Sequence, residues 1–462
     1  MAQTLNLLDN SLHNLIGGTS DGRKIESLNL EKGKKSIDYA NLRVLSSELD
    51  ARLHDKEFIK KNLLLFGENY EHNTDDGLLK IDGWNDDNYL IETGNLVGYV
   101  ATKQFKINIS SRFGDEFLKY LLCDVEGLLE VPDSGTIDKK GFIDWIMIFL
   151  WKNALKRAYR LGIPKQYISR HEKLCSVKGN VDALNYSIYK GLDGKVLCDY
   201  YQYDYNNPVT QLIAYTFSKI EKKALIQDCI QLKNSFEACT EGKKTSLSAC
   251  LDTRSISNPY YSAYNQVISL SKNILRKRFG DISNSSDISS AFLFDMSMLF
   301  EHYIRKLLKC NDLNLFPKNE DTMTISRGLG KNDDRHLYPD IVIDKGNNEI
   351  EVYDVKYKHF NPKYGVKRED LFQLHTYVLY LSNMYTITKC GIIYPKKEED
   401  ESISDTDNII RHPNYKKNID GIPFRVIFFN IPNEDMSMAN YKSLMTEKEK
   451  AFVEAINPLK KH

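Results

Sequence analysis

The spacing of hydrophobic residues changes along the chain and divides it into parts. Up to about residue 114, short apolar runs and alternating positions such as Phe105, Ile107 and Ile109 are interrupted by turn signals, which is typical of strands and hairpins. Beyond Phe117 apolar residues recur mainly every three or four positions, which predicts helices. The pattern therefore predicts a β-rich N-terminal domain over 1–114 and a mainly helical middle region over 115–284.

The last part of the chain combines the hydrophobic spacing of strands with that of helices. The polar segment 281–290 is interpreted as a domain boundary, with Ser289 or Ser290 capping a helix whose apolar positions run from Phe292 to Leu307. The strand candidates and the helix that follow occupy 341–343, 350–357, 369–382 (the helix), 391–394 and 424–431. Strands and helices alternate as in an α/β domain, so we expect a multidomain α+β protein whose third domain, 285–462, is α/β.

Composition narrows the class of protein. The 462 residues contain 63 Lys plus Arg and 63 Asp plus Glu, so no global positive field attracts a polyanion, and a nucleic-acid contact must be local or shared with a partner. No apolar run approaches the ~20 residues that span a bilayer, and the first ten residues lack the features of a secretory signal. We expect no membrane contact and a cytoplasmic location, where the eight widely spaced cysteines stay reduced.

One stretch is locally basic. Residues 151–174 carry seven Lys and Arg side chains against a single acid, Glu172. Such a run is commonly a solvated helix face. The alternative is a contact with phosphates or with an acidic partner surface.

Charged residues interrupt two apolar strands of the third domain. Asp340 follows Pro339 and precedes an apolar trio, and fourteen residues later comes Asp354-Val355-Lys356. In a strand Asp354 and Lys356 point to the same face, and charges in such a strand are costly unless they are paired or functional.

These residue types suit phosphodiester hydrolysis. The carboxylates of Asp340 and Asp354 and the backbone carbonyl of Val355 are hard oxygen ligands for Mg²⁺, with Mn²⁺ as a substitute. Lys356 would orient the attacking water, lower its pKa or stabilise charge in the transition state, and the sequence does not separate these roles.

Two predicted helices flank these strands. Glu301 lies beside the apolar stripe of the first helix and either reaches the metal, directly or through a water, or is a surface acid. Gln373 and Tyr377 share one face of the second helix and either line the site beside Lys356 or belong to an ordinary helix surface. The ordered set of helix, two strands and helix describes the core of an αβ-βα nuclease.

Longer phrases carry a family resemblance. "FDMSMLFEHYIRKLL", "YPDIVID", "EVYDVKYK" and "REDLFQLHTYVLYL" resemble the catalytic domain of the McrC family, the nuclease subunits of McrBC-type restriction systems in the PD-(D/E)XK superfamily. Upstream, "LVGYVATKQFKINISSRF", "LGIPKQYISRHEKLCSVKGNVD" and "YYQYDYNNPVTQLIAYTF" are similar to McrC-like proteins, including those of LlaJI-type systems. The resemblance covers most of the chain from about Leu96 onward.

The resemblance implies a fold, a site and a partner. The third domain would be a PD-(D/E)XK nuclease core with a mixed central sheet, acting on double-stranded DNA. The implied roles are metal ligands for Asp340 and Asp354, catalytic lysine for Lys356, accessory acid for Glu301 and supporting pair for Gln373 with Tyr377. The part upstream of the nuclease would dock on a McrB-like AAA+ GTPase ring and stimulate it. This chain has no G-x-x-x-x-G-K-[ST] loop, so we expect it to bind no nucleotide itself.

Three functions compete at this point. The leading one is a Mg²⁺-dependent DNA endonuclease subunit of a modification-dependent, McrBC-like restriction system. The second is chiefly an assembly factor that activates a partner GTPase. The third is a stand-alone repair-type nuclease, which the neutral net charge disfavours because little non-specific DNA affinity is available.

Overall fold

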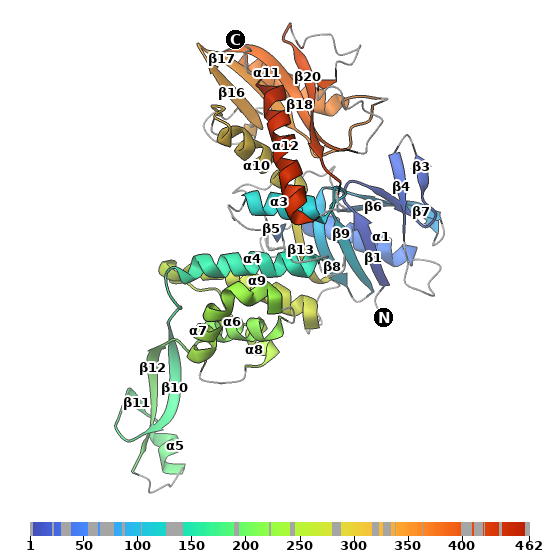
Figure 1. Cartoon of the computed structure of the whole chain (residues 1–462). Coiled ribbons are helices and arrows are strands. Elements are labelled where there is room, and N and C mark those ends of the chain that lie inside the picture. The colour runs from blue at the N-terminus through green and yellow to red at the C-terminus, as the bar shows by residue number, and fades with distance from the viewer. Residues whose placement is uncertain are drawn as a thin grey trace. The chain divides into compact units, whose positions relative to one another are not determined.

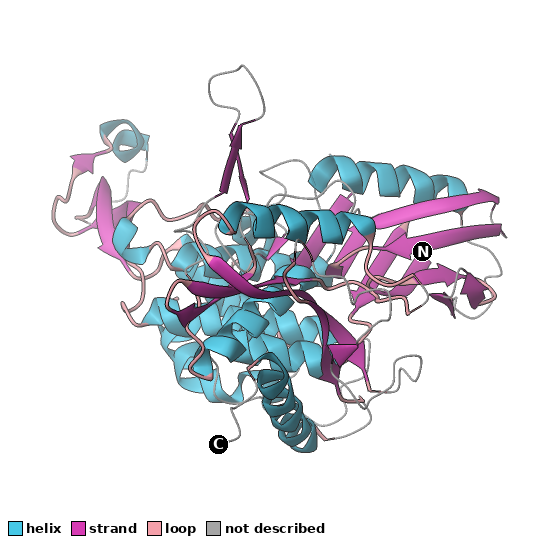
Figure 2. Ribbon diagram, turned by 90° about the horizontal axis from the view of Figure 1, so that it is seen from above, coloured by secondary structure: helices cyan, strands magenta, loops and turns pink. Residues whose placement is uncertain are grey.

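The structure is a computed structural model of the chain (Figure 1). It describes residues 3–20, 23–28, 38–53, 63–64, 78–85, 88–102, 104–125, 142–188, 194–220, 223–240, 245–279, 288–316, 323–326, 334–337, 339–362, 364–398, 409–410, 419, 421–433 and 437–457, which are coloured by secondary structure in Figure 2. The chain forms two compact units, one made of Met1–Gly135 with Ala291–His462 and the other of Thr136–Ser290. The expected boundaries at 114/115 and 284/285 remain a prediction.

The N-terminal part of the first unit is rich in strands, and in β1 (Gln3–Leu8), β7 (Asn88–Thr93) and β9 (Phe105–Ser110) buried residues alternate with more exposed ones. In one sheet β1 pairs in parallel with β9, and the order is β1-β9-β8-β13-β5. The second sheet has the order β3-β4-β2-β7-β6. The remaining strands of the two sheets are β8 (Leu96–Thr102), β13 (Ile288–Asp295), β5 (Leu63–Leu64), β3 (Gly18–Ser20), β4 (Arg23–Ser27), β2 (Leu12–Asn14), β7 (Asn88–Thr93) and β6 (Leu79–Asn85). Two helices, α1 (Tyr39–Leu53) and α3 (Asp115–Val125), accompany them.

The expected helix start near residue 290 is wrong. Residues 288–295 form β13, which pairs with β5, and the helix α10 (Met296–Cys310) begins only after it. Asp295 is the N-cap, because its side chain accepts hydrogen bonds from the backbone N–H groups of Ser297 and Met298. Apolar residues at 292–294 fit a buried strand as well as a helix, and pairing with β5 decides for the strand. Most of the polar boundary segment, 281–287, lies outside the described residues.

The C-terminal part of the first unit holds a mixed sheet with the order β16-β17-β18-β20-β19. β16 and β17 are antiparallel, β17, β18 and β20 run parallel, and β19 is antiparallel to β20. The strands are β16 (Ile341–Gly346), β17 (Glu349–Val355), β18 (Thr386–Lys397), β19 (Ile409–Ile410) and β20 (Phe424–Ile431). A separate antiparallel pair consists of β14 (Met323–Ser326) and β15 (Asp334–Leu337). The expectation of a multidomain α+β protein is confirmed.

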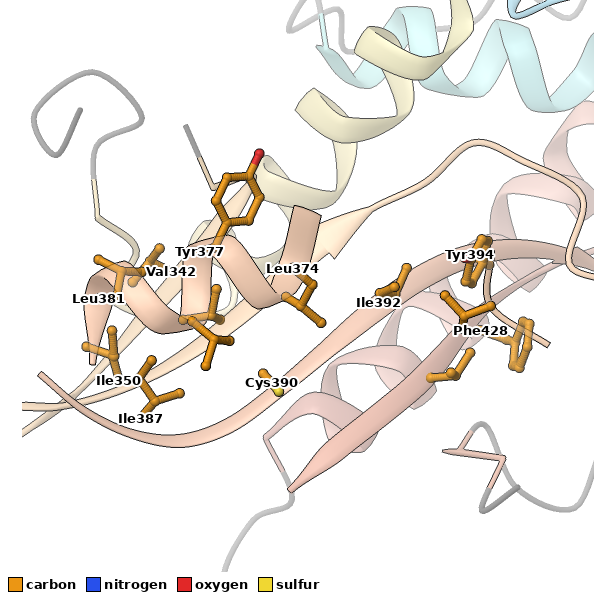
Figure 3. Packing of buried hydrophobic residues seen from close by; sticks show 14 of the residues in the cluster. Val342, Ile350, Leu374, Tyr377, Leu381, Ile387, Cys390, Ile392, Tyr394 and Phe428 are labelled. Atoms are coloured by element: carbon orange, nitrogen blue, oxygen red, sulfur yellow. The ribbon is translucent and has the colours of Figure 1, made fainter. Parts of the chain in front are cut away.

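Helices cover both faces of this mixed sheet. On β20, the buried side chain of Phe428 belongs to the apolar cluster that packs beneath α11 (Arg368–Leu381), part of which is drawn in Figure 3. The next residue, Phe429, points to the other face, where its ring lies 5.2 Å from Phe452 of α12 (Met438–Ile456) and 5.5 Å from Tyr303 of α10. The predicted helix at 369–382 is confirmed as α11, and Glu369 and Asp370 in its first turn suit the positive end of the helix dipole.

The second unit combines helices with a strand ribbon. Trp151 of α4 lies at the helical core, where its indole donates to Ser271 Oγ of α9 at 2.8 Å and its ring meets Phe217 of α6 at 4.6 Å. The helices are α4 (Phe142–Tyr159), α5 (Ala183–Ile188), α6 (Pro208–Lys219), α7 (Ile230–Cys239), α8 (Leu247–Leu251) and α9 (Tyr264–Phe279), with 3-10 turns at Lys223–Cys229 and Pro259–Tyr261. The ribbon consists of β10 (Gln166–Leu174), β12 (Val196–Asp204) and β11 (Asn180–Val181), with α5 beyond its end (Figure 1). Sequence periodicity missed this ribbon.

None of the helices in the described residues combines the length and the apolar character that a bilayer crossing requires.

Candidate active site

The hairpin of β16 and β17 brings Asp340 to the end of β17. Asp340 directly precedes β16, and the antiparallel register pairs Ile341 with Tyr353. The backbone N–H of Val355 then donates to Asp340 Oδ2 at 2.8 Å. Tight pairing of two buried strands therefore fixes the first candidate carboxylate.

Asp354 and Lys356 meet on one side of the same segment, as strand alternation predicts. Lys356 Nζ lies 2.9 Å from Asp354 Oδ2, and the side chain of Asp354 is fully buried. Removing one partner of such a pair leaves an uncompensated buried charge, which commonly costs about 3–5 kcal/mol. The ion pair thus ties the two candidate residues to each other.

The pKa values of the pair reflect burial first and the neighbouring charges second. Burial, and then the neighbouring carboxylate of Asp340, raise the pKa of Asp354 well above its usual range, although the ammonium of Lys356 opposes them. Burial lowers the pKa of Lys356, but the carboxylates of Asp354 and Asp340 outweigh it and raise the net value. Within the described part of the chain, Asp354 Oδ1 is buried without a hydrogen-bond partner. The site therefore brings two carboxyl groups together beside a single lysine.

A chain of hydrogen bonds connects Lys356 to α11. Lys356 Nζ donates to Gln373 Oε1 at 2.7 Å, and Gln373 Nε2 donates to the hydroxyl of Tyr377 at 2.8 Å. The spacing of four residues puts both side chains on one face of the helix. Figure 3 shows the Tyr377 hydroxyl directed away from the apolar cluster to which its ring belongs. Burial, followed by the nearby Asp340 and Asp354, raises the pKa of Tyr377, so the phenol stays neutral.

Glu301 lies on α10, half-buried, one turn before Arg305. Arg305 Nη1 donates to the backbone carbonyl of Asp340, and its Nη2 donates to the carbonyl of Phe316 at 3.0 Å. Residues four apart share a helix face, so Glu301 belongs to the face of α10 that reaches Asp340. The structure thus brings together Asp340, Val355, Asp354, Lys356, Gln373 and Tyr377, and it places Glu301 on the adjoining helix face.

Sequence reasoning missed several residues of this neighbourhood. Arg305 donates to the backbone carbonyl of Asp340. The sequence feature that could have pointed to it is its position four residues after Glu301, on the same face of the helix. Asp370 is buried, and its carboxylate accepts from Lys358 Nζ at 3.2 Å and from the Tyr394 hydroxyl at 3.3 Å. The sequence feature that could have pointed to Lys358 is strand alternation, because Lys358 follows Lys356 by two residues.

The donor set fits a hard divalent cation. Two carboxylates converge, and one of their oxygens is buried with no protein donor in the described residues. A nearby cation would lower the raised pKa of Asp354 and favour its charged form. Asp340 and Asp354 thus offer carboxylate oxygens, the ligand type that Mg²⁺ and Mn²⁺ prefer.

The basic stretch of the second unit is only partly a solvated face. Lys152 and Lys156 both contact Asp228, at 2.8 and 2.6 Å, and Lys152 is buried. Arg157 on α4 and Arg160, directly after its end, are exposed. Part of this charge is thus used inside the unit, and part of it reaches the surface.

An exposed aromatic face covers the neighbouring ribbon. Tyr167 and Tyr203 are paired across β10 and β12, with ring centroids 4.9 Å apart, and Lys165 Nζ lies 4.2 Å from the ring of Tyr205. Tyr201, which lies on β12 with Tyr203, is three-quarters exposed. Contiguous exposed apolar surface of this kind commonly marks an interaction site.

Fold and site together define a multidomain α+β protein with a buried carboxylate–lysine centre. The family model described as "McrBC 5-methylcytosine restriction system component" matches residues 91–395. Since this match spans more than half of the chain, the chain belongs to the McrBC 5-methylcytosine restriction system component family, and the resemblance found in the sequence is confirmed.

Two solved structures are similar to this chain. One is a half-complex from a tetradecameric assembly of Thermococcus gammatolerans McrB AAA+ hexamers with bound McrC. The sequence identity is 14%, the match covers 98% of this chain and 99% of that chain, and the TM-score is 0.46. The other is the Thermococcus gammatolerans McrBC complex, with 14% identity, coverage of 68% and 89%, and a TM-score of 0.35. The comparison with curated proteins gives no match.

Proposed function

We propose that this chain is the DNA endonuclease subunit of a modification-dependent, McrBC-like restriction system, with a PD-(D/E)XK nuclease core in its C-terminal part. The observation that carries the proposal is the meeting of Asp340, Asp354 and Lys356 at the end of two buried strands. Membership of the McrBC family supports the restriction context. DNA restriction also implies a cytoplasmic location.

Each residue has a role in this proposal. Asp340 and Asp354 would hold Mg²⁺, with the Val355 carbonyl as a further ligand and Glu301 acting directly or through a water. Bound Mg²⁺ supplies positive charge that activates water and offsets charge on the phosphate. Lys356, oriented by Gln373, stabilises negative charge that develops on the scissile phosphate.

The proposal is tested with Asp354→Ala in the full chain, assembled with its AAA+ partner, on methylated plasmid DNA with Mg²⁺ and GTP. We expect cleavage to be lost. Glu349→Ala is the matched control, because it removes an exposed carboxylate from the same strand. Cleavage by Asp354→Ala at the parental rate contradicts the nuclease assignment.

A McrB-like AAA+ GTPase ring is the proposed partner. The second unit offers an exposed tyrosine face and the exposed Arg157 and Arg160 as docking surface. Because this chain lacks a phosphate loop, GTP turnover belongs to the ring.

Activation of that GTPase is a second function of the same chain. The observation that favours it is that the exposed Tyr167, Tyr201 and Tyr203 lie in one compact unit and the proposed catalytic residues in the other. Stimulation of GTP hydrolysis by Asp354→Ala protein, at the level of the parental chain, would show that activation does not depend on cutting. Loss of stimulation together with cleavage would contradict this separation.

A further inference from the structure

Three segments of the first unit meet directly behind Lys356. The next residue, Tyr357, is buried, and its backbone carbonyl accepts a hydrogen bond from Asn10 Nδ2 at 2.9 Å. Its hydroxyl lies 3.4 Å from Ser111 Oγ. The N-terminal segment and the residue directly after β9 (Phe105–Ser110) therefore both contact the residue that follows the candidate catalytic lysine.

A buried charged cluster fills this junction. The guanidinium of Arg112 lies over the rings of Phe113 and Tyr357, with its central carbon 4.7 and 4.6 Å from their centroids. The backbone N–H of Arg112 donates to Oδ1 of the fully buried Asp9 at 2.6 Å. Cation–π contacts of a desolvated arginine contribute about 2 kcal/mol or more, so Tyr357 is firmly held.

These contacts add to those that hold the backbone at Lys356 in place. Its own N–H donates to the carbonyl of Ile393 on β18 at 2.9 Å. Asn10 holds the carbonyl of the following residue. The backbone is thus fixed on both sides of the position from which the ammonium reaches Asp354.

Packing alone does not account for the cluster. In the described residues, both Nη atoms of Arg112 and Oδ2 of Asp9 are buried without hydrogen-bond partners. Each such group costs about 1–3 kcal/mol, and an apolar replacement of similar shape is often neutral or stabilising. The cluster therefore leaves part of its hydrogen-bonding capacity unused while it holds Tyr357 in one position.

We propose that Asn10 and Arg112 are positioning residues, through which the N-terminal segment fixes Tyr357 and thereby the backbone that carries Lys356. This inference rests on the proposed nuclease function. It gives the N-terminal part a role in cutting, because a displacement of about 1 Å at a catalytic group can cost ~100-fold in rate.

The central variant is Asn10→Gly. Asn10 has a φ of 46°, a left-handed conformation that glycine adopts without strain, so the substitution removes the amide without distorting the backbone. The matched control is Asn6→Ala, because Asn6 is exposed on β1 and accepts from Asn108 of β9 at 2.9 Å, away from Tyr357. Arg112→Lys is a second variant that keeps the charge but not the planar contact with two rings.

The full chain, assembled with its AAA+ partner, is assayed for kcat and KM on methylated plasmid DNA with saturating Mg²⁺, and the chain alone for Mn²⁺ affinity by calorimetry. For Asn10→Gly we expect kcat to fall 10- to 100-fold, with KM and Mn²⁺ affinity within twofold of the parental values. Arg112→Lys should show the same split with a smaller loss, and Asn6→Ala should match the parental chain.

Other outcomes overturn the inference. Parental kcat in Asn10→Gly and in Arg112→Lys, with Asp354→Ala inactive, would refute the positioning role while the nuclease assignment stands. A joint decrease of kcat, Mn²⁺ affinity and melting temperature would show that these residues have only a structural role. If the parental chain and Asp354→Ala cut DNA equally, the proposed function itself fails, and that result is distinct from both others.

Discussion

The ammonium of Lys356 donates to the side-chain carbonyl of Gln373 at 2.7 Å, and this bond joins the end of β17 to the middle of α11. The lysine is thereby shared between an acid on its own strand and an amide on a covering helix. Since Gln373 also donates to Tyr377, whose ring is part of the core, the position of the ammonium is coupled to core packing.

Gln373→Ala should therefore lower cleavage more than metal binding. It removes the acceptor that orients Lys356 and leaves both carboxylates in place. We expect the cleavage rate to fall about 10- to 100-fold, the range seen when groups that orient a metal site are removed, with little change in Mn²⁺ affinity. Leu379→Ala, at an exposed position of the same helix, is the control. An unchanged rate would show that Asp354 alone orients the lysine.

Arg157 and Arg160 provide a test of the second unit. Reversing both charges with Arg157→Glu and Arg160→Glu should weaken binding to the AAA+ ring, because both side chains are exposed in the unit that also carries the exposed tyrosines. Binding is measured by co-sedimentation, with Arg254→Glu, also exposed in this unit, as the control. Loss of DNA binding instead would indicate a phosphate contact, and no loss would indicate a solvated face.

His171 gives the ribbon a pH dependence. A hydrogen bond to Asp199, whose Oδ1 lies 2.5 Å from Nδ1, and the charge of Asp182 raise the pKa of His171 above its ordinary 6.5. Because the folded state favours the protonated form, the stabilisation is fully present below about pH 6.5 and is lost as pH rises through the raised pKa. An NMR titration of the imidazole should show the raised value, and Asp199→Asn should lower it. A titration at the ordinary value in the parental chain would contradict the contact.

Gly391 tests the packing of the mixed sheet. A Cβ at this position would lie 2.5 Å from the carbonyl oxygen of Arg425 and 3.1 Å from the ring of Tyr353. Gly391→Ala should therefore destabilise the chain by about 1–3 kcal/mol, measured by denaturant unfolding. Thr386→Ala, at an exposed position of the same strand, should have a much smaller effect. Equal effects of the two variants would contradict the close approach.

Much of the candidate site was accessible from the sequence because its signals are local. Strand alternation predicted that Asp354 and Lys356 share a face, and helical spacing predicted the same for Gln373 and Tyr377. Both relations appear in the structure as direct contacts. Their catalytic roles remain predictions.

The errors came from signals that local spacing does not contain. The apolar run 292–294 was assigned to a helix, because a buried strand and a helix look alike over so few residues, and only pairing with β5 distinguishes them. The ribbon of β10 and β12 was missed for a similar reason, since its tyrosines and charges give no clean alternation of apolar and polar residues.

By itself, the sequence determined the strand and helix periods around the site, the order of the acids and the lysine, and the family. Tertiary structure alone decided that Asn10 and Arg112, more than two hundred residues from Lys356 in the chain, surround the residue next to it. The reason is physical. Residues that share a strand or a helix are placed by backbone geometry, whereas contacts between distant segments depend on how whole sheets pack, which no local spacing records.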